Sequence, residues 1–93
     1  MWQKRNEDRM SYTVVIAPRV KKQIAKLPIH ILTKISNAIR EIAENPFQGK
    51  PLKAQLAGLY SFRAGQYRII YNIVRHEIRV EIIKVMHRKD VYR

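Results

Sequence analysis

The sequence predicts an α+β fold with the order β-α-α-β-β-β, in which a helix hairpin packs on one face of a curved, mainly antiparallel four-stranded sheet. Apolar residues recur at helical spacing between residues 18 and 42, and three runs rich in β-branched and aromatic residues follow from residue 59. The 93 residues are enough for one domain. We expect residues 11–93 to form this domain. Residues 1–10 show no apolar periodicity and are predicted to be a flexible basic extension.

The first strand and the first helix are read from local composition. Residues 12–16 are a short aromatic and β-branched run, which is typical of a strand. Apolar residues then recur at spacings of four and three over residues 18–27, which predicts a helix. Pro18 suits the first turn of that helix, because its missing N–H would have no partner there.

The second helix has the clearest pattern in the chain. One apolar stripe at spacings of three and four is formed by Ile29, Leu32, Ile35, Ile39 and Ile42. The pattern ends at Asn45-Pro46 and Gly49. Because only Pro28 separates the two helices, we expect them to form an antiparallel hairpin.

Three strands are predicted over residues 59–63, 67–74 and 78–85, joined by turns short enough for hairpins. Together they form a meander, which the first strand joins. Side chains alternate between the two faces of a strand, so Ile69 and Tyr71 would face the helices. Arg68 would then project from the opposite, open face, with Arg63 near it on the neighbouring strand.

Charge and composition restrict the classes of function. Nineteen Lys and Arg against seven Asp and Glu give a net charge of +12, which favours a polyanionic partner. Nucleic acid is the leading candidate, ahead of an anionic membrane or an acidic protein. No apolar run approaches the roughly 20 residues that span a bilayer, so we expect a cytoplasmic protein without membrane contact. With no cysteine and only scattered carboxylates, we expect neither a metal nor another cofactor.

The arginines and the polar tail suggest phosphate chemistry. Guanidinium groups of Arg63, Arg68 and Arg88 would present paired donors to phosphate oxygens. Cleavage of RNA by its own 2′-hydroxyl builds negative charge on those oxygens, and fixed cations lower that barrier. His87, Tyr92 or a lysine would move the protons. Nucleic-acid binding without catalysis is the simpler alternative reading of the same residues.

Basic residues elsewhere would attract RNA from a distance. Lys21, Lys22 and Lys26 lie on the polar sides of the first helix, where they form a solvated face. They are our candidates for contacts with RNA or the ribosome, together with Lys50 and Lys53 in the loop before the meander.

The stretches PLKAQLAGLYSFRAGQYRIIY and HRKDVYR resemble the RelE branch of the RelE/ParE toxin superfamily of type II toxin–antitoxin systems, and the likeness covers nearly all of residues 11–93. The resemblance implies an enzyme that enters the ribosomal A site and cuts messenger RNA there without a metal, leaving a 2′,3′-cyclic phosphate. It also implies a cognate antitoxin, acidic and partly disordered when free, which masks the site. Operator DNA would be bound only through the toxin–antitoxin complex.

The resemblance also assigns roles to residues. Arg63, Arg68 and Arg88 would hold the scissile phosphate, and Tyr92 would stack on a base or orient the 2′-hydroxyl. The best-studied branch has two lysines where this sequence has Leu59 and Ser61.

Because those two lysines are absent here, the group that takes the proton from the 2′-hydroxyl is left open between Lys50, Lys53 and His87. Two other functions remain as alternatives: a ParE-like inhibitor of DNA gyrase, and a non-catalytic nucleic-acid-binding partner in operon repression. The closing HRKDVYR, with its tyrosine, favours the nuclease.

Overall fold

The computed structural model describes residues 11–91, so the predicted extension over residues 1–10 and Tyr92 lie outside the described part. A five-stranded sheet has the order β1-β5-β4-β3-β2. Its strands are β1 (Thr13–Ile16), β2 (Lys50–Pro51), β3 (Leu59–Ala64), β4 (Tyr67–Val74) and β5 (Arg79–His87). The helices are α2 (Pro18–Ala25), α3 (Ile29–Glu44) and the four-residue α4 (Arg88–Val91).

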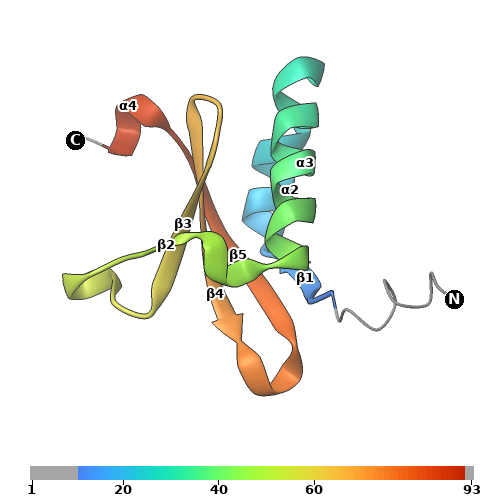
Figure 1. Cartoon of the computed structure of the whole chain (residues 1–93). Helices are drawn as coiled ribbons and strands as arrows, with labels where there is room; N and C mark the ends of the chain where they lie inside the picture. The colour runs from blue at the N-terminus through green and yellow to red at the C-terminus, as the bar shows by residue number, and fades with distance from the viewer. Residues whose placement is uncertain (1–10, 92–93) are drawn as a thin grey trace, which may run out of the picture.

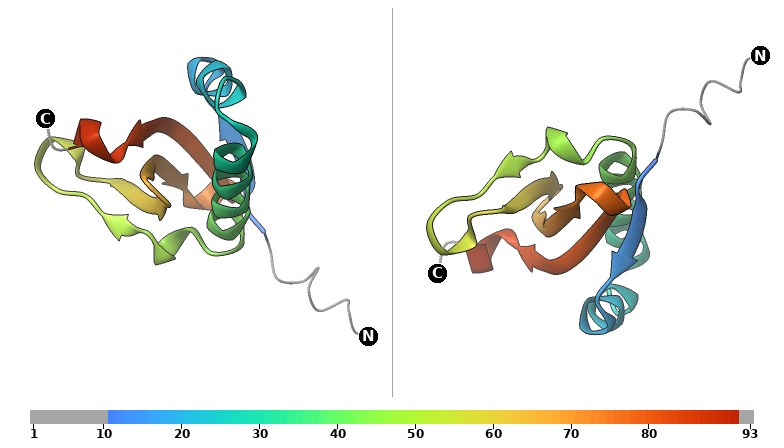
Figure 2. Two further views of the ribbon diagram at one scale, coloured as in Figure 1. Left: turned by 90° about the horizontal axis from the view of Figure 1, so that it is seen from above. Right: turned by 90° about the horizontal axis from the view of Figure 1, so that it is seen from below.

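The predicted α+β architecture is confirmed. β1 pairs with β5 in parallel, and the remaining pairs are antiparallel. Figure 2 shows the sheet curling, with the β2–β3 segment along one side and β5 along the other. The prediction of four strands omitted β2, because two residues carry no periodicity. Lys50 of this short edge strand pairs with Ser61 of β3.

The two long helices cover one face of the sheet and run in opposite chain directions (Figure 1). α3 buries Ile35, Ala38 and Ile42 against the sheet. Each fully buried isoleucine contributes about 1.5–3 kcal/mol relative to an exposed one. Ile29 was wrongly placed in the buried stripe: it is the first residue of α3, and it is 74% exposed. Contact with the core begins one turn later, near Leu32.

The expected alternation on β4 is confirmed, since Ile69 and Tyr71 are fully buried in the core between the sheet and the helices. The hydroxyl of Tyr71 donates a hydrogen bond to the Pro46 carbonyl oxygen at 2.7 Å. Burial raises the pKa of Tyr71 to about 12. Through this bond the central strand fixes the segment that leads to β2, and Gly49 in that segment packs directly against the Tyr71 hydroxyl.

A β-bulge interrupts the pairing of β4 with β5. Ile70 is opposite Lys84, yet the next residue, Tyr71, is opposite Ile82, so Ile83 is an extra residue. Ile83 and Lys84 are consecutive and both exposed. The bulge therefore reverses the alternation of β5: residues that would have faced the helices beyond this point face outward instead.

Candidate functional site

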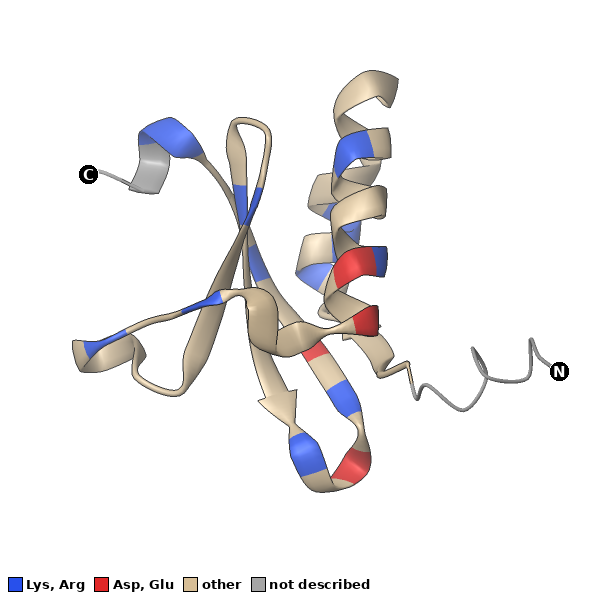
Figure 3. Cartoon of the chain, viewed as in Figure 1, with Lys and Arg blue, Asp and Glu red and all other residues tan. Residues whose placement is uncertain are grey.

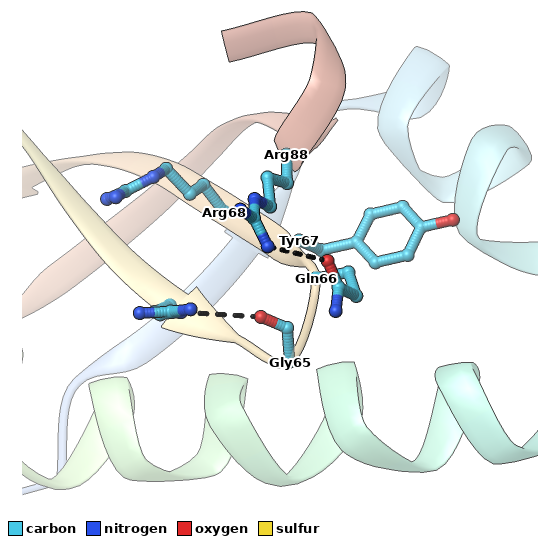
Figure 4. Close-up of a pocket in the computed structure, with 6 residues that line it drawn as sticks. Gly65, Gln66, Tyr67, Arg68 and Arg88 are labelled. Atoms are coloured by element: carbon cyan, nitrogen blue, oxygen red, sulfur yellow. Dashed lines mark hydrogen bonds between the residues drawn. The ribbon is translucent and has the colours of Figure 1, made fainter. Parts of the chain in front are cut away.

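The predicted arginines lie around the β3–β4 turn, on the face of the sheet away from the helices. A hollow of about 90 Å³ is lined by Arg63, Gly65, Gln66, Tyr67, Arg68 and Arg88 (Figure 4). The ring of Tyr67 points away from the arginines in Figure 4, toward the helix side. The turn is possible because Gly65 adopts φ +63°, a conformation that side-chain-bearing residues rarely take. Strands β3 and β4 can therefore meet directly at this end.

Arg63 and Arg68 are cross-strand partners and project from the same face. Arg68 Nη1 donates to the hydroxyl of Ser61 at 3.2 Å, and Ser61 is only 4% exposed. Arg63 Nε donates to the Gly65 carbonyl oxygen at 3.4 Å. Like charges placed directly opposite each other destabilise a sheet. The pair is therefore arranged as it would be for an anionic ligand that neutralises both cations.

Arg88 joins the pair from the end of β5, where α4 begins. Its backbone N–H donates to the Gln66 carbonyl oxygen at 2.6 Å. Its Nη1 donates to Oε1 of Gln66 at 3.4 Å. The β3–β4 turn thus orients two of the arginines, Arg63 through Gly65 and Arg88 through Gln66.

His87 is not part of this hollow. Met86 is the partner of Arg68, so the next residue along β5 projects to the opposite face. The His87 ring contacts Tyr67 edge to face, with centroids 5.1 Å apart. Its Nδ1 accepts a hydrogen bond from the Lys89 backbone N–H at 3.1 Å, which leaves the ring proton of the neutral form on Nε2.

The predicted lysines are spread over three places. Lys50 shares the open face with Ser61, its cross-strand partner, and so stands beside the arginine pair. Lys53 precedes a short turn of 3-10 helix in the loop between β2 and β3, and it is exposed. The exposed lysines Lys21 and Lys22 of α2, and Lys26 directly after that helix, belong to the helix layer rather than to the hollow. Tyr92 lies beyond the described residues.

The described carboxylates gather at the other end of the molecule (Figure 3). Glu41 and Glu44 end α3, while Glu77 and Glu81 lie on the β4–β5 hairpin. Arg79 forms ion pairs with Glu77 and, at 3.0 Å, with Glu81. Hydrogen bonds from Asn72, which has the larger effect, and from Arg79 lower the pKa of Glu81. None of the described residues that line the arginine hollow is a carboxylate.

Three residues at the open face were missed in the sequence. Ser61 accepts a hydrogen bond from Arg68, and Gln66 accepts one from Arg88. The spacing of two between Ser61 and Arg63 places both on one face, but no pattern in the sequence indicates either supporting contact. Lys84 did leave a signal, because the buried residues Val80, Ile82 and Val85 are spaced by two and then by three. That change of spacing marks the bulge.

Between residues 11 and 91 no three His, Cys, Asp or Glu side chains are placed to hold a metal ion. Nor does any helix in that range have the length and apolar character needed to cross a membrane. The chemistry available at the hollow is therefore that of guanidinium donors: binding and charge stabilisation of an oxyanion.

Comparison with known proteins places these features in a family. A family model described as the ParE toxin of the type II toxin–antitoxin system parDE matches residues 14–92. Toxin RelG of Mycobacterium tuberculosis is 38% identical over 86 residues, which are 90% of this chain and 99% of that protein. Toxin RelE of the same organism is 35% identical, over 92% of this chain and 91% of that protein. The crystal structure of the M. tuberculosis toxin–antitoxin complex RelBE2 contains a chain with a TM-score of 0.76 and 36% identity, covering 84% of this chain and 99% of that chain.

Proposed function

This chain belongs to the RelE/ParE family of toxins from type II toxin–antitoxin systems, and from that premise we propose that it is an endoribonuclease that cuts messenger RNA in the ribosomal A site. The observation that carries the proposal is the convergence of Arg63, Arg68 and Arg88 on one hollow, whose described lining residues include no carboxylate. A hollow of this kind suits a single phosphodiester, and the open face gives a strand of RNA access to it.

The reaction follows from the charge distribution at the hollow. The 2′-hydroxyl of the RNA loses its proton and attacks the neighbouring phosphorus. The bond to the 5′-oxygen breaks, and that oxygen takes up a proton and leaves as a 5′-hydroxyl, so that the other product ends in a 2′,3′-cyclic phosphate. Negative charge accumulates on the non-bridging oxygens, where the guanidinium groups donate hydrogen bonds. No metal is needed to supply a nucleophile, because the substrate contains its own. Lys50 stands on the same face as the arginines and is a closer candidate for the proton acceptor than His87, which faces the helix side.

Net charge and family context suggest the partners. With +12, the protein has the long-range attraction that ribosomal RNA and messenger RNA require, and the α2 lysines extend the cationic surface. An antitoxin partner is supported by the structural relative, which is a toxin–antitoxin complex. We infer an acidic antitoxin segment that covers the open face, with operator DNA bound through the complex.

The test is a translation reaction reconstituted from purified components, in which 5′ ends on the message are mapped with and without ribosomes. We expect cuts at A-site codons that require ribosomes. Arg68→Ala should lower the single-turnover rate by about 100- to 1,000-fold, the usual effect of removing one oxyanion donor. Arg68→Lys should recover only part of the rate, because it retains the charge but loses the paired donors.

Arg75→Ala is the matched control. Arg75 lies at the far end of β4, with its guanidinium 5.0 Å from the centre of the Phe47 ring. The Arg75→Ala variant should therefore cut at the wild-type rate. Wild-type cutting by a folded Arg68→Ala would refute the role of the cluster. If wild-type protein makes no cuts but blocks supercoiling by gyrase, the gyrase alternative replaces the nuclease. If it does neither, the non-catalytic repressor partner is left.

A further inference from the structure

Lys84 reaches the open face only because of the bulge in β5. Val80 and Ile82 are buried against the helices, so simple alternation would place Lys84 in the core with them. The extra residue, Ile83, shifts the inward–outward alternation of side chains by one residue. Lys84 therefore becomes the exposed cross-strand partner of Ile70. Bulges of this kind redirect side chains next to functional sites.

The position of Lys84 relative to the arginines follows from the strand register. Arg68 is paired with Met86, and Lys84 is two residues away on the same strand and the same face. Such diagonal neighbours lie about 7–8 Å apart, within reach of long side chains. Consecutive cross-strand pairs link four residues across the sheet, in the order Lys84, Ile70, Ser61 and Lys50. The open face thus has a row with a lysine at each end, next to the row that contains Arg63 and Arg68.

Lys84 forms no ion pair with the carboxylates whose side chains the structure describes. The ion pairs among those side chains involve His76, Arg79, Glu77 and Glu81, at the β4–β5 hairpin. Lys84 is one of the lining residues of a mainly apolar groove, together with Ile70 and Met86. The described carboxylate nearest to Lys84 in the register of this face is Glu81, the partner of Asn72, and Arg79 already pairs with it at 3.0 Å. A cation beside two arginines that this carboxylate does not neutralise is suited to a second phosphate of the same ligand.

We propose that Lys84 binds the RNA backbone at the phosphate next to the scissile one, so that the bulge in β5 extends the site by one nucleotide. This inference rests on the proposed nuclease function. It assigns Lys84 to substrate binding and not to proton transfer. The flanking phosphate carries the same charge in the ground state and in the transition state, so its contact lowers KM and leaves kcat unchanged.

The experiment compares Lys84→Ala and Lys84→Arg with wild type in cleavage on ribosomes programmed with a defined message. Arg40→Ala is the control, because it removes one charge from an exposed residue of α3 that bonds only to Asn37 Oδ1, at 3.2 Å. Lys84→Ala should raise KM about tenfold, as expected for the loss of one charge-assisted hydrogen bond. Its kcat should not change. Lys84→Arg should restore KM to within about twofold of wild type, because a phosphate accepts either cation.

Salt dependence separates this role from a structural one. The slope of log KM against log salt concentration should fall by about 0.7 in Lys84→Ala, the value for one lost contact to single-stranded nucleic acid, and should stay at the wild-type value in Arg40→Ala. An unchanged KM and slope would overturn the proposal. So would a lower kcat with unchanged KM and no rescue by arginine, which would make Lys84 a proton-transfer group. A wild-type protein that makes no cuts refutes the nuclease itself, and the inference falls with it.

Discussion

The contact between Gly49 and Tyr71 predicts a large effect for the substitution Gly49→Ala. Gly49 has φ −72°, which alanine adopts without strain, so any cost is steric. A Cβ at this position would overlap the Tyr71 hydroxyl and would stand 3.0 Å from Tyr71 Cζ and 3.2 Å from the Ser61 carbonyl oxygen. Tyr71 is fully buried and has no open space to move into.

The magnitude follows from two contributions. Overpacking by one methyl group costs about 1–3 kcal/mol. Displacing the Tyr71 hydroxyl also breaks its hydrogen bond to the buried Pro46 carbonyl, which costs about 1–3 kcal/mol. Together they lower the expected free energy of unfolding of Gly49→Ala by about 2–6 kcal/mol. For a domain of this size each kcal/mol is worth about 4–8 °C, so Tm should fall by at least about 8 °C.

The assay is a double-mutant cycle by urea or thermal unfolding, with Gly49→Ala, Tyr71→Phe and the double variant. Removing the hydroxyl makes room for the new methyl group, so the two losses should fall short of additivity by about 1–2 kcal/mol. The rescue should be partial, because the contacts to Cζ and to Ser61 remain. Wild-type stability of Gly49→Ala, or strict additivity in the cycle, would refute this account of the central strand.

Three further predictions concern acid stability, the extension and the tail. The pKa of Glu81 lies below its ordinary 4.5, so the stabilising effect of this carboxylate is complete above pH 4.5 and is lost as pH falls through the lowered pKa. Glu81→Gln should therefore have a lower Tm than wild type at about pH 7, and the difference should vanish in acid. A difference in Tm that does not change with pH would contradict this account. Deleting residues 1–9 should leave cleavage at its wild-type rate, measured as above, because that stretch has no apolar pattern; a loss would place it in the site. Tyr92→Phe should retain more cleavage than Tyr92→Ala if stacking is its role, whereas equal losses would assign the role to the hydroxyl.

The fold could be predicted because its long elements carry long patterns. The apolar stripe of α3 repeats over several helical turns, and the alternation of β4 repeats over several residue pairs. A single deviation therefore does not hide either pattern. The same reasoning failed for β2, which is two residues long, and for Ile29. Periodicity gives the direction in which a side chain points, but not whether the sheet extends far enough to meet it.

The site was predicted in part for a similar reason. Arg63 and Arg68 follow from alternation across a short turn, and no bulge separates them. His87 and Lys84 lie beyond Ile83, where counting from the buried residues Val80 and Ile82 gives the wrong face for both. Uninterrupted alternation would have placed His87 beside the arginines and Lys84 in the core, the reverse of what the register shows. Arg88 is held by Gln66, a contact that depends on how the turn and α4 meet in space.

The parallel pairing of β1 with β5 has a consequence for synthesis. Among the described strands β1 is the first to be made, and its register partners, from Arg79 to Ile82, belong to the last of them. β5 also lies between β1 and β4 in the sheet, so the sheet cannot close until β5 has left the ribosome. Pairings this distant in sequence form slowly, because the loop entropy is lost before the contacts form. A nascent chain therefore lacks the finished open face until β5 has emerged, and the proposed nuclease would be inactive until then.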